Sequence, residues 1–256
     1  MDIIQSIILG IVQGITEWLP ISSKSHLILL QNFFGVVQPA IFDLMLHLGS
    51  LAVVFVVFWK DIMKIVRGAL ALDKYYLKFL GLLIVATIPV AVIGFIFKHQ
   101  IETALSNLYI LGFGFLFTAI MLFFSKFPIA KDRTLNYFNS SIIGIGQAFS
   151  VLPGISRSGM TISTGMILGI KKDDVAKFSF LMFIPAILGA TILEIKDIGS
   201  VSNIPAMIVG MVCAMIAGYL ALRLLLDIIK KDKFYWFSIY CGVLGVLVLL
   251  FAYKVF

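Results

Sequence analysis

Charged residues are scarce in this chain of 256 residues, where Asp, Glu, Lys and Arg make up only 13%. An ordinary soluble domain carries about 25% charged residues. Cysteine is also scarce, and the two present lack CxxC spacing and nearby ligands. Hydrophobic residues instead make up 61%, with a mean hydropathy of +1.09. A water-soluble globule could not hide so much apolar surface. The composition therefore excludes a soluble nucleotide-binding fold, a secreted disulfide scaffold and a disordered chain, and predicts an all-α, polytopic membrane protein.

The charge that is present is unbalanced, with 20 basic and 13 acidic residues and a net charge of +7. Most of the basic residues lie in short loops between apolar segments. No basic face carries interleaved aromatic residues, which argues against nucleic acid as a partner. The excess is instead typical of the loops that set membrane topology.

Six apolar segments are long enough to span a bilayer, which takes about 20 residues. They are residues 42–59, 79–97, 108–125, 175–194, 204–226 and 234–253. Two further apolar stretches, 3–34 and 138–170, are each broken in the middle by polar and helix-ending residues. Their halves, about 12–16 residues long, are short for a span and predict two re-entrant helix–loop–helix hairpins.

The loops predict the orientation of these segments. Loops 60–78, 126–136 and 227–233 are rich in Lys and Arg, whereas loops 98–107 and 195–203 are poor in them. The positive-inside rule places the first set in the cytoplasm. The first hairpin then enters from outside and the second from the cytoplasmic face, so that their tips meet near the midplane. Irregular backbone at that depth is tolerated where it lines a cavity or is buried in protein.

The two halves of the chain align with each other. Gln13 matches Gln147 and Ser22 matches Ser156, both at an offset of 134 residues. The sequence therefore predicts a single membrane domain, 1–256, built from a first repeat, 1–126, and a second, inverted repeat, 137–256. Each repeat has one hairpin and three spans, and the odd number of spans inverts the second copy. Inverted repeats of this kind place their site at the repeat interface.

The first tip has the residue types of a nucleophilic site. Gln13 and Glu17 are four residues apart and share a helix face, and Pro20 ends that helix. Ser23 and His26 are three apart, a spacing that lets the imidazole reach the hydroxyl. A serine activated by a base is a standard nucleophile. His47, by contrast, is interpreted as a structural residue, or as one that supports the site from behind, rather than as a nucleophile.

The second tip has the residue types of an anion site. Gly154 allows close approach of the backbone, and Arg157 presents a fork of donors that suits phosphate oxygens. Ser156 and Ser158 add hydroxyl donors, and Thr161 lies one turn after Arg157. The start of a helix is itself an anion site. The two tips together predict phosphoester chemistry within the membrane.

Charge deep in a bilayer costs on the order of 2.5–3.5 kcal/mol and marks a functional site by default. Glu17 and Arg157 are such charges. A purely structural Glu17–Arg157 ion pair is the competing interpretation, but it leaves the surrounding serines and glycines without a role.

At these residues the chain resembles the undecaprenyl-diphosphate phosphatase family of the bacitracin-resistance type. The first motif runs from Gln13 through Glu17 and Pro20 to His26, and the second, Pro-Gly-x-Ser-Arg-Ser-x-x-Thr, is matched in full from Pro153 to Thr161. The resemblance covers nearly the whole chain. Two departures stand out: Gln13 replaces a Glu that many members carry, and Lys24-Ser25 replaces Thr-Gly or Ser-Gly.

The resemblance implies hydrolysis of undecaprenyl diphosphate to undecaprenyl phosphate and phosphate, which recycles the lipid carrier of cell-wall synthesis. Ser23 is predicted to attack the terminal phosphorus with His26 as base and Glu17 in support, and His26 is the alternative nucleophile. Arg157 is predicted to hold the transferred phosphoryl group. The other predicted phosphate-binding residues are Gln13, Ser22, Gly154, Ser156, Ser158 and Thr161.

Several properties stay open at this point. A divalent cation, Mg²⁺ or Ca²⁺, would have Glu17 as its ligand, but Gln13 weakens any model with two carboxylates. The family implies a plasma-membrane protein, a site open to the outer face and a homodimer. A lipid-phosphate translocase is the alternative function, because inverted repeats with broken helices also suit transport.

Overall fold

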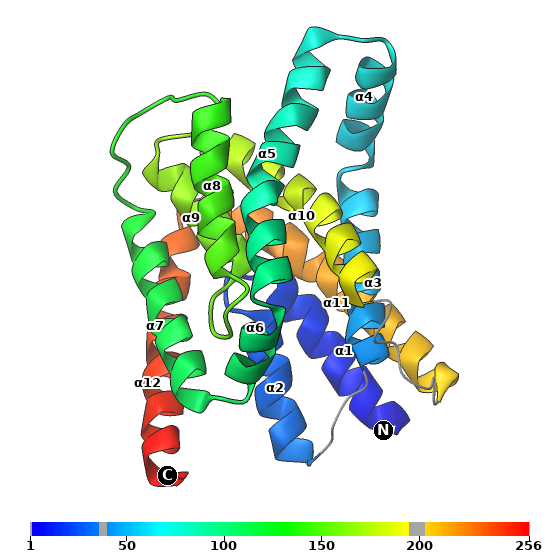
Figure 1. Ribbon diagram of the computed structural model, residues 1–256, viewed down its shortest axis with the longest axis vertical. Helices are drawn as coiled ribbons and strands as arrows, with labels where there is room; N and C mark the ends of the chain where they lie inside the picture. Colours follow the sequence, from blue (N-terminus) through cyan, green and yellow to red (C-terminus); the bar gives the residue numbers. More distant parts are fainter. Residues whose placement is uncertain (1, 36–39, 195–202, 256) are drawn as a thin grey trace.

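The computed structural model describes residues 2–35, 40–194 and 203–255, and over these ranges the fold is helical, with no β-strand longer than the isolated bridge between Arg133 and Ile170. Figure 1 shows a bundle of long helices in which the two broken stretches enter from opposite ends. The chain is a multi-pass membrane protein, as its composition predicts.

The first hairpin consists of α1 (Ile3–Trp18) and α2 (Ser23–Phe34). Asp2 begins α1 with a capping box, in which its side chain accepts from the backbone N–H of Gln5. Helix α1 ends before Pro20, because proline cannot continue a helix. The second hairpin consists of α8 (Tyr137–Phe149) and α9 (Arg157–Ile167). In Figure 1 the first hairpin enters from the lower end and the second from the upper end, which confirms the predicted arrangement.

All six predicted spans are present as helices. They are α3 (Ala40–Val57), α5 (Lys74–Ile96), α7 (Leu108–Phe124), α10 (Lys172–Glu194), α11 (Ile204–Lys230) and α12 (Phe237–Val255), the last preceded by the 3-10 turn η2 (Phe234–Trp236). Helices α5, α10 and α11, and α12 together with η2, are long and apolar enough to cross a membrane, and α3 and α7 are so together with the short helices that follow or precede them.

Two segments predicted as loops are helical instead. Residues 60–78 contain α4 (Trp59–Leu70), bent by 78° from α3, and residues 98–107 contain α6 (Lys98–Leu105), bent by 98° from α7. In α4 the apolar residues repeat at helical spacing between basic ones, so the segment forms an amphipathic helix. The charges of such a segment predict that it lies at a membrane surface. They do not predict whether it is a loop or a surface helix.

Small residues allow the closest helix contacts. Gly10 and Gly14 on α1 lie against the backbone of Gly210 and Ala214 on α11, and a Cβ at either glycine would collide with a carbonyl oxygen there. Gly144 on α8 meets the carbonyl of Ala86 on α5 in the same way. Small residues four apart are the usual device for close helix packing in membranes. Under the predicted repeat α1 corresponds to α8 and α11 to α5, so both copies pair alike; the boundaries 1–126 and 137–256 stay a prediction.

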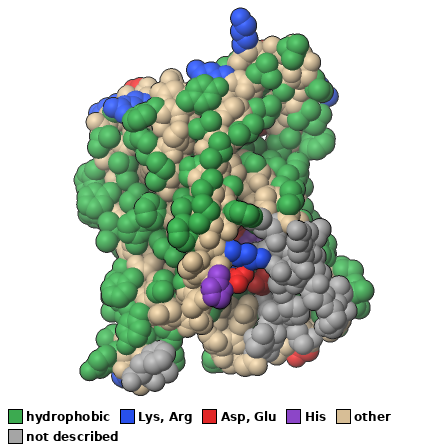
Figure 2. Space-filling model, in the orientation of Figure 1, with side chains coloured by type: hydrophobic (Ala, Val, Ile, Leu, Met, Phe, Trp, Pro, Cys, Tyr) green, Lys and Arg blue, Asp and Glu red, His purple; other side chains and the backbone are tan. Residues whose placement is uncertain are grey.

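The surface of the bundle fits a bilayer. Figure 2 shows apolar side chains over the middle of one face, with Lys and Arg gathered at the upper end. Large apolar residues point outward from the spans, among them Ile84, Phe95, Leu220 and Leu250, which are 57–70% exposed. A soluble protein would rarely expose so large an apolar patch, whereas lipid tails cover it without cost.

Candidate active site

The link between α1 and α2 is a tight turn with an unusual backbone. Ser22 stands at the N-cap position of α2 with φ 67 and ψ 89, in the left-handed region, and its hydroxyl makes no capping bond. A non-glycine residue held there costs on the order of 1–3 kcal/mol, and such residues cluster at functional sites. Within the described ranges, no side chain caps the first N–H groups of α2, so these groups are available to a ligand.

The link between α8 and α9 has its own turn chemistry. Gly154 has φ +85, and a Cβ there would collide with the carbonyl oxygen of Leu111 on α7. Ser156 is the N-cap of α9, and its hydroxyl accepts from the N–H of Gly159 at 3.1 Å. Thr118 on α7 fixes the turn by donating to the Gly154 carbonyl at 3.0 Å and accepting from the Ser156 N–H at 3.1 Å.

The two hairpins are bonded to each other. The hydroxyl of Ser25 accepts from the backbone N–H of Gly154 at 2.5 Å, and Ser25 also lies 3.0 Å from the Ser22 hydroxyl. The hydroxyl of Ser158 donates across to the carbonyl of Leu19 at 3.5 Å. Ser25 is fully buried. The predicted meeting of the two tips is therefore confirmed, and Ser25 is the residue that joins them most closely.

Ser25→Ala is expected to lower both stability and activity. The substitution leaves the buried N–H of Gly154 without an acceptor, which costs about 1–3 kcal/mol, and loosens the turn that precedes Arg157. The thermal midpoint of the purified protein and its rate of phosphate release check this. Ser141→Ala, which removes only an exposed bond to the carbonyl one turn earlier on α8, is the matched control. Equal midpoints for the two variants would contradict the assigned role.

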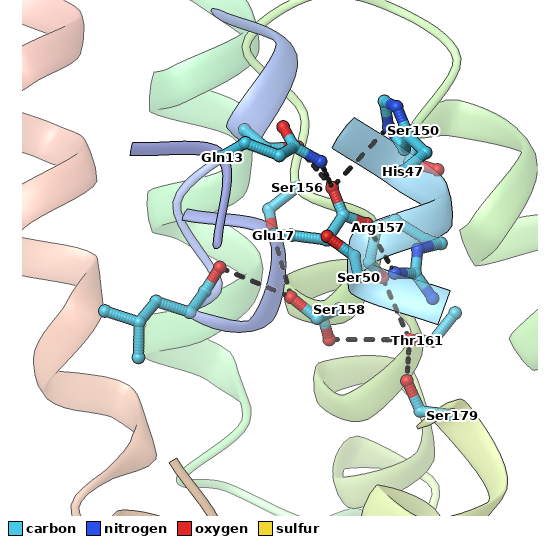
Figure 3. A network of polar contacts seen from close by, with 12 residues as sticks. Gln13, Glu17, His47, Ser50, Ser150, Ser156, Arg157, Ser158, Thr161 and Ser179 are labelled. Carbon is cyan, nitrogen blue, oxygen red and sulfur yellow. Dashed lines mark hydrogen bonds and ion pairs between the residues drawn. The ribbon is translucent and has the colours of Figure 1, made fainter. Parts of the chain in front are cut away.

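Glu17, at the end of α1, is the centre of the site (Figure 3). Its Oε1 is 2.7 Å from Nη2 of Arg157, a residue 140 positions away in the chain. Its Oε2 accepts from the hydroxyl of Ser23 at 2.6 Å and from the amide of Gln13 at 3.1 Å. The predicted acid, hydroxyl and guanidinium thus lie in one cluster, with the side chain of Glu17 only 6% exposed.

Arg157 is held in an orientation that leaves donors available. Its guanidinium carbon lies 4.2 Å from the centre of the Phe183 ring on α10, a cation–π contact. Nη2 binds Glu17, while Nη1 is buried and has no hydrogen-bond partner among the residues that the structure describes. A buried charged donor without an acceptor is costly, so this nitrogen is suited to an oxygen supplied by a ligand.

The predicted bond between Ser23 and His26 is wrong for this structure. The hydroxyl of Ser23 donates to Glu17, whereas His26 Nδ1 lies 2.8 Å from the carbonyl oxygen of Ser22 and Nε2 lies 2.7 Å from the hydroxyl of Tyr240 on α12. The spacing does place both residues on neighbouring faces of α2. The His26 ring, however, packs edge-on against Phe115 and turns toward α12, away from α1.

The other predicted residues have varied surroundings. Gln13, Ser156 and Ser158 lie buried beside the cluster, and Gly154 forms the turn. Thr161 lies one turn after Arg157 on α9, and its hydroxyl bonds the Arg157 carbonyl at 2.9 Å and the hydroxyl of Ser179 on α10 at 2.5 Å. In this arrangement Thr161 supports the helix that carries Arg157.

Two residues at the site are absent from the catalytic and phosphate-binding residues predicted from the sequence. His47 on α3, interpreted from the sequence as a structural or supporting residue, has its Nε2 3.8 Å from Glu17 Oε2, and Figure 3 shows it facing that carboxylate. Tyr240 binds His26 from the other half of the chain. A histidine within an apolar span is a usable signal in the sequence, whereas nothing near Tyr240 in the chain marks it.

The donor set suits a divalent cation poorly. Both Glu17 oxygens are already bonded, one of them to a guanidinium. Among residues 2–35, 40–194 and 203–255, no group of three or more His, Cys, Asp or Glu could hold a metal ion. Mg²⁺ and Ca²⁺ prefer several oxygen ligands. Glu17 is therefore not placed as a metal ligand by these residues.

The fold and the cluster define a class: a helical membrane protein in which two re-entrant hairpins enclose a buried acid, hydroxyl and guanidinium. Comparison with known proteins identifies the family. The model of the family described as Bacitracin resistance protein BacA matches residues 6–247, and the chain belongs to this family.

Relatives resemble the chain along nearly its whole length. The undecaprenyl-diphosphatase of Methanobrevibacter smithii is 40% identical, with 97% of each chain covered. That of Carboxydothermus hydrogenoformans is 38% identical over 97% of each, and that of Caldicellulosiruptor bescii is 41% identical over 98% of each. The similarity thus includes both hairpins and all of the spans.

Proposed function

We propose that this protein hydrolyses undecaprenyl diphosphate to undecaprenyl phosphate and inorganic phosphate in the plasma membrane. The observation that carries the proposal is the cluster of Glu17, Ser23 and Arg157, because it joins a hydroxyl, its proton acceptor and a phosphate-binding cation. The names of the relatives support the same activity. The recycled lipid phosphate would serve cell-wall synthesis.

The reaction begins with Ser23. Its Oγ attacks the terminal phosphorus and its proton passes to Glu17, to which it already donates at 2.6 Å. The bond from phosphorus to the bridging oxygen breaks, and the electron pair leaves on the lipid monophosphate. Arg157 and the free N–H groups at the start of α2 hold the phosphoryl oxygens. Positioning and charge stabilisation of this kind dominate phosphoryl transfer. Water then hydrolyses the phosphoserine.

The neighbouring polar residues have supporting roles. Ser22, Gly154, Ser156 and Ser158 shape the two turns around the phosphate, and Gln13 fixes the Glu17 carboxylate. His26 is the alternative nucleophile. To act, it would have to exchange its bond with Tyr240 for one with the substrate. No step of the proposal passes through a metal ion.

The bundle offers room for the prenyl tail. An apolar groove of about 590 Å³ runs between α5, α6 and α8 and includes Val151 and Leu152, which lie in the link between α8 and α9. The Lys-rich end in Figure 2 is the cytoplasmic end by the positive-inside rule, and the first hairpin enters from the opposite end. This supports a site that opens to the outer face. A homodimer stays a prediction.

A phosphate-release assay tests the function. Protein purified in detergent is mixed with undecaprenyl diphosphate, with and without a chelator, and free phosphate is measured. We expect release in both arms. A lipid-phosphate translocase, the alternative, would bind the headgroup and release nothing, and a loss of activity with chelator would restore the requirement for a cation.

A further inference from the structure

The protonation of His47 follows from its partners. Its Nδ1 lies 2.8 Å from the carbonyl oxygen of Asp43, one turn earlier on α3. A carbonyl oxygen only accepts, so Nδ1 carries the proton. In a neutral imidazole the other nitrogen, Nε2, then has a free lone pair. That lone pair faces the Glu17 carboxylate, with 3.8 Å between Nε2 and Oε2 (Figure 3).

The same carboxylate oxygen receives the hydroxyl of Ser23. Oε2 of Glu17 accepts from Ser23 at 2.6 Å on one side and faces His47 on the other. A proton that stays on Glu17 would leave Arg157 without its counter-ion inside the protein, which is costly. A proton passed on to Nε2 keeps the Glu17–Arg157 pair intact. Transfer requires the 3.8 Å gap to close by roughly 0.8 Å to a hydrogen-bond distance of about 3.0 Å.

The other neighbours of Glu17 do not offer this capacity. The amide of Gln13 donates to Oε2 at 3.1 Å and cannot take up a proton. Both nitrogens of His26 are bonded elsewhere, to Ser22 and Tyr240. Gln13 carries an amide at this position, so it adds no titratable group beside Glu17. His47 supplies one, next to the same oxygen of Glu17.

We propose that His47 is the proton acceptor of this site and acts through Glu17; the inference rests on the proposed function. In the first step the Ser23 proton moves by way of Glu17 to Nε2 as the bond from Oγ to phosphorus forms and the lipid monophosphate leaves. In the second step water attacks the phosphoserine, and one of its protons stays on the released phosphate. The other restores the hydroxyl of Ser23. The proton that Ser23 lost in the first step therefore remains on His47.

The surroundings of His47 allow that proton to leave. Its side chain is 24% exposed, against 6% for Glu17. Within residues 2–35, 40–194 and 203–255, the charged groups that face it are Glu17 from α1 and, beyond that carboxylate, Arg157 from α9, while its own helix contributes Asp43. Helix α10 presents the Phe183 ring to Arg157, and α11 meets α3 through Met211 at Gly49.

The test compares four proteins by the pH dependence of phosphate release from undecaprenyl diphosphate. They are the unmodified protein, His47→Gln, the double variant Gln13→Glu/His47→Gln, and the control His99→Gln on the exposed part of α6. The acceptor must start unprotonated, so kcat/KM of the unmodified protein should fall tenfold per unit toward low pH. His47→Gln should be about 100-fold slower near neutral pH, the lower range for a lost general base, and should lack that acid limb.

The double variant Gln13→Glu/His47→Gln tests whether a second titratable group beside Glu17 can replace His47. A carboxyl in place of the Gln13 amide would lie beside the same Glu17 oxygen. Two carboxyl groups at such a short distance share a proton. We expect it to recover at least about tenfold of the loss, with a new pH dependence, while His99→Gln matches the unmodified protein. An unchanged acid limb in His47→Gln, or no recovery in the double variant, overturns the inference. An acid limb that disappears when chelator is added also overturns it, because a bound cation would then bridge the two groups.

Two further outcomes are possible: His47→Gln is destabilised, or the unmodified protein releases no phosphate. If His47→Gln lowers the thermal midpoint, the comparison is made with His47→Ala and added imidazole: recovery supports the relay, and no recovery overturns it. If the unmodified protein releases no phosphate at all, the proposed function fails and this inference fails with it. Normal release with no effect at His47 overturns only the inference.

Discussion

Arg157→Ala is expected to reduce phosphate release by at least about 10³-fold, the lower range for an arginine that stabilises a phosphoryl transition state. It also leaves Glu17 as an unpaired buried charge, and breaking a buried ion pair costs about 3–5 kcal/mol. The thermal midpoint should therefore fall together with activity. Arg157→Lys keeps the charge but loses the planar fork, so it should recover stability more than rate. The rate of phosphate release and the thermal midpoint, measured on the same preparations, check both effects.

Two variants separate a catalytic Arg157 from a structural one. Arg223→Ala removes an exposed arginine that lies 5.5 Å from the Tyr219 ring on α11, and it should leave both readouts unchanged. The double variant Glu17→Gln/Arg157→Met removes both charges, so it should regain stability without activity. Substantial turnover by this double variant would show that the pair is structural, as the competing interpretation holds.

Ser23→Ala is expected to reduce turnover to background, a loss of at least about 10³-fold, while the fold is retained. The substitution removes the attacking oxygen, and a lost nucleophile is not replaced by the remaining groups. Ser23 is only half-buried, and Glu17 keeps its bonds to Gln13 and Arg157. The thermal midpoint should therefore change little. Rapid acid quenching of the unmodified protein with labelled substrate should also trap phosphoserine at this position.

Ser106→Ala is the matched control, because this hydroxyl donates only to an exposed carbonyl at the end of α6. It should match the unmodified protein in rate and midpoint. A Ser23→Ala variant with full activity would reject Ser23 as the nucleophile and transfer that role to His26. In that event Tyr240→Phe, which frees His26 Nε2, should change the rate as well.

Much of the architecture could be predicted because the bilayer restricts the choice. Long apolar segments have to be helices, since no water satisfies the backbone at that depth. The breaks near Pro20 and Gly154 were readable because proline and glycine have direct backbone consequences. Helices α4 and α6 were missed because they lie outside the spans, where hydropathy no longer selects one structure.

The sequence predicted which residue types form the site, but not all of the hydrogen-bond partners of each residue. Glu17 and Arg157 stood out because charge within a membrane is expensive, and their contact is as predicted. The Ser23–His26 bond was inferred from spacing along one helix. Spacing defines the face of a helix, but the direction of a side chain depends on what packs against that face, here Phe115 and Tyr240.

The chain's composition and segment pattern thus determined a helical membrane protein with two opposed hairpins that bear an acid and a guanidinium, because the cost of exposing polar backbone and charge to lipid leaves few alternatives. Only the tertiary structure decided that Ser23 bonds Glu17, that His26 is held by a residue 214 positions away, and that His47 faces the site. These contacts join helices distant in the chain, and their geometry depends on packing that no local pattern encodes.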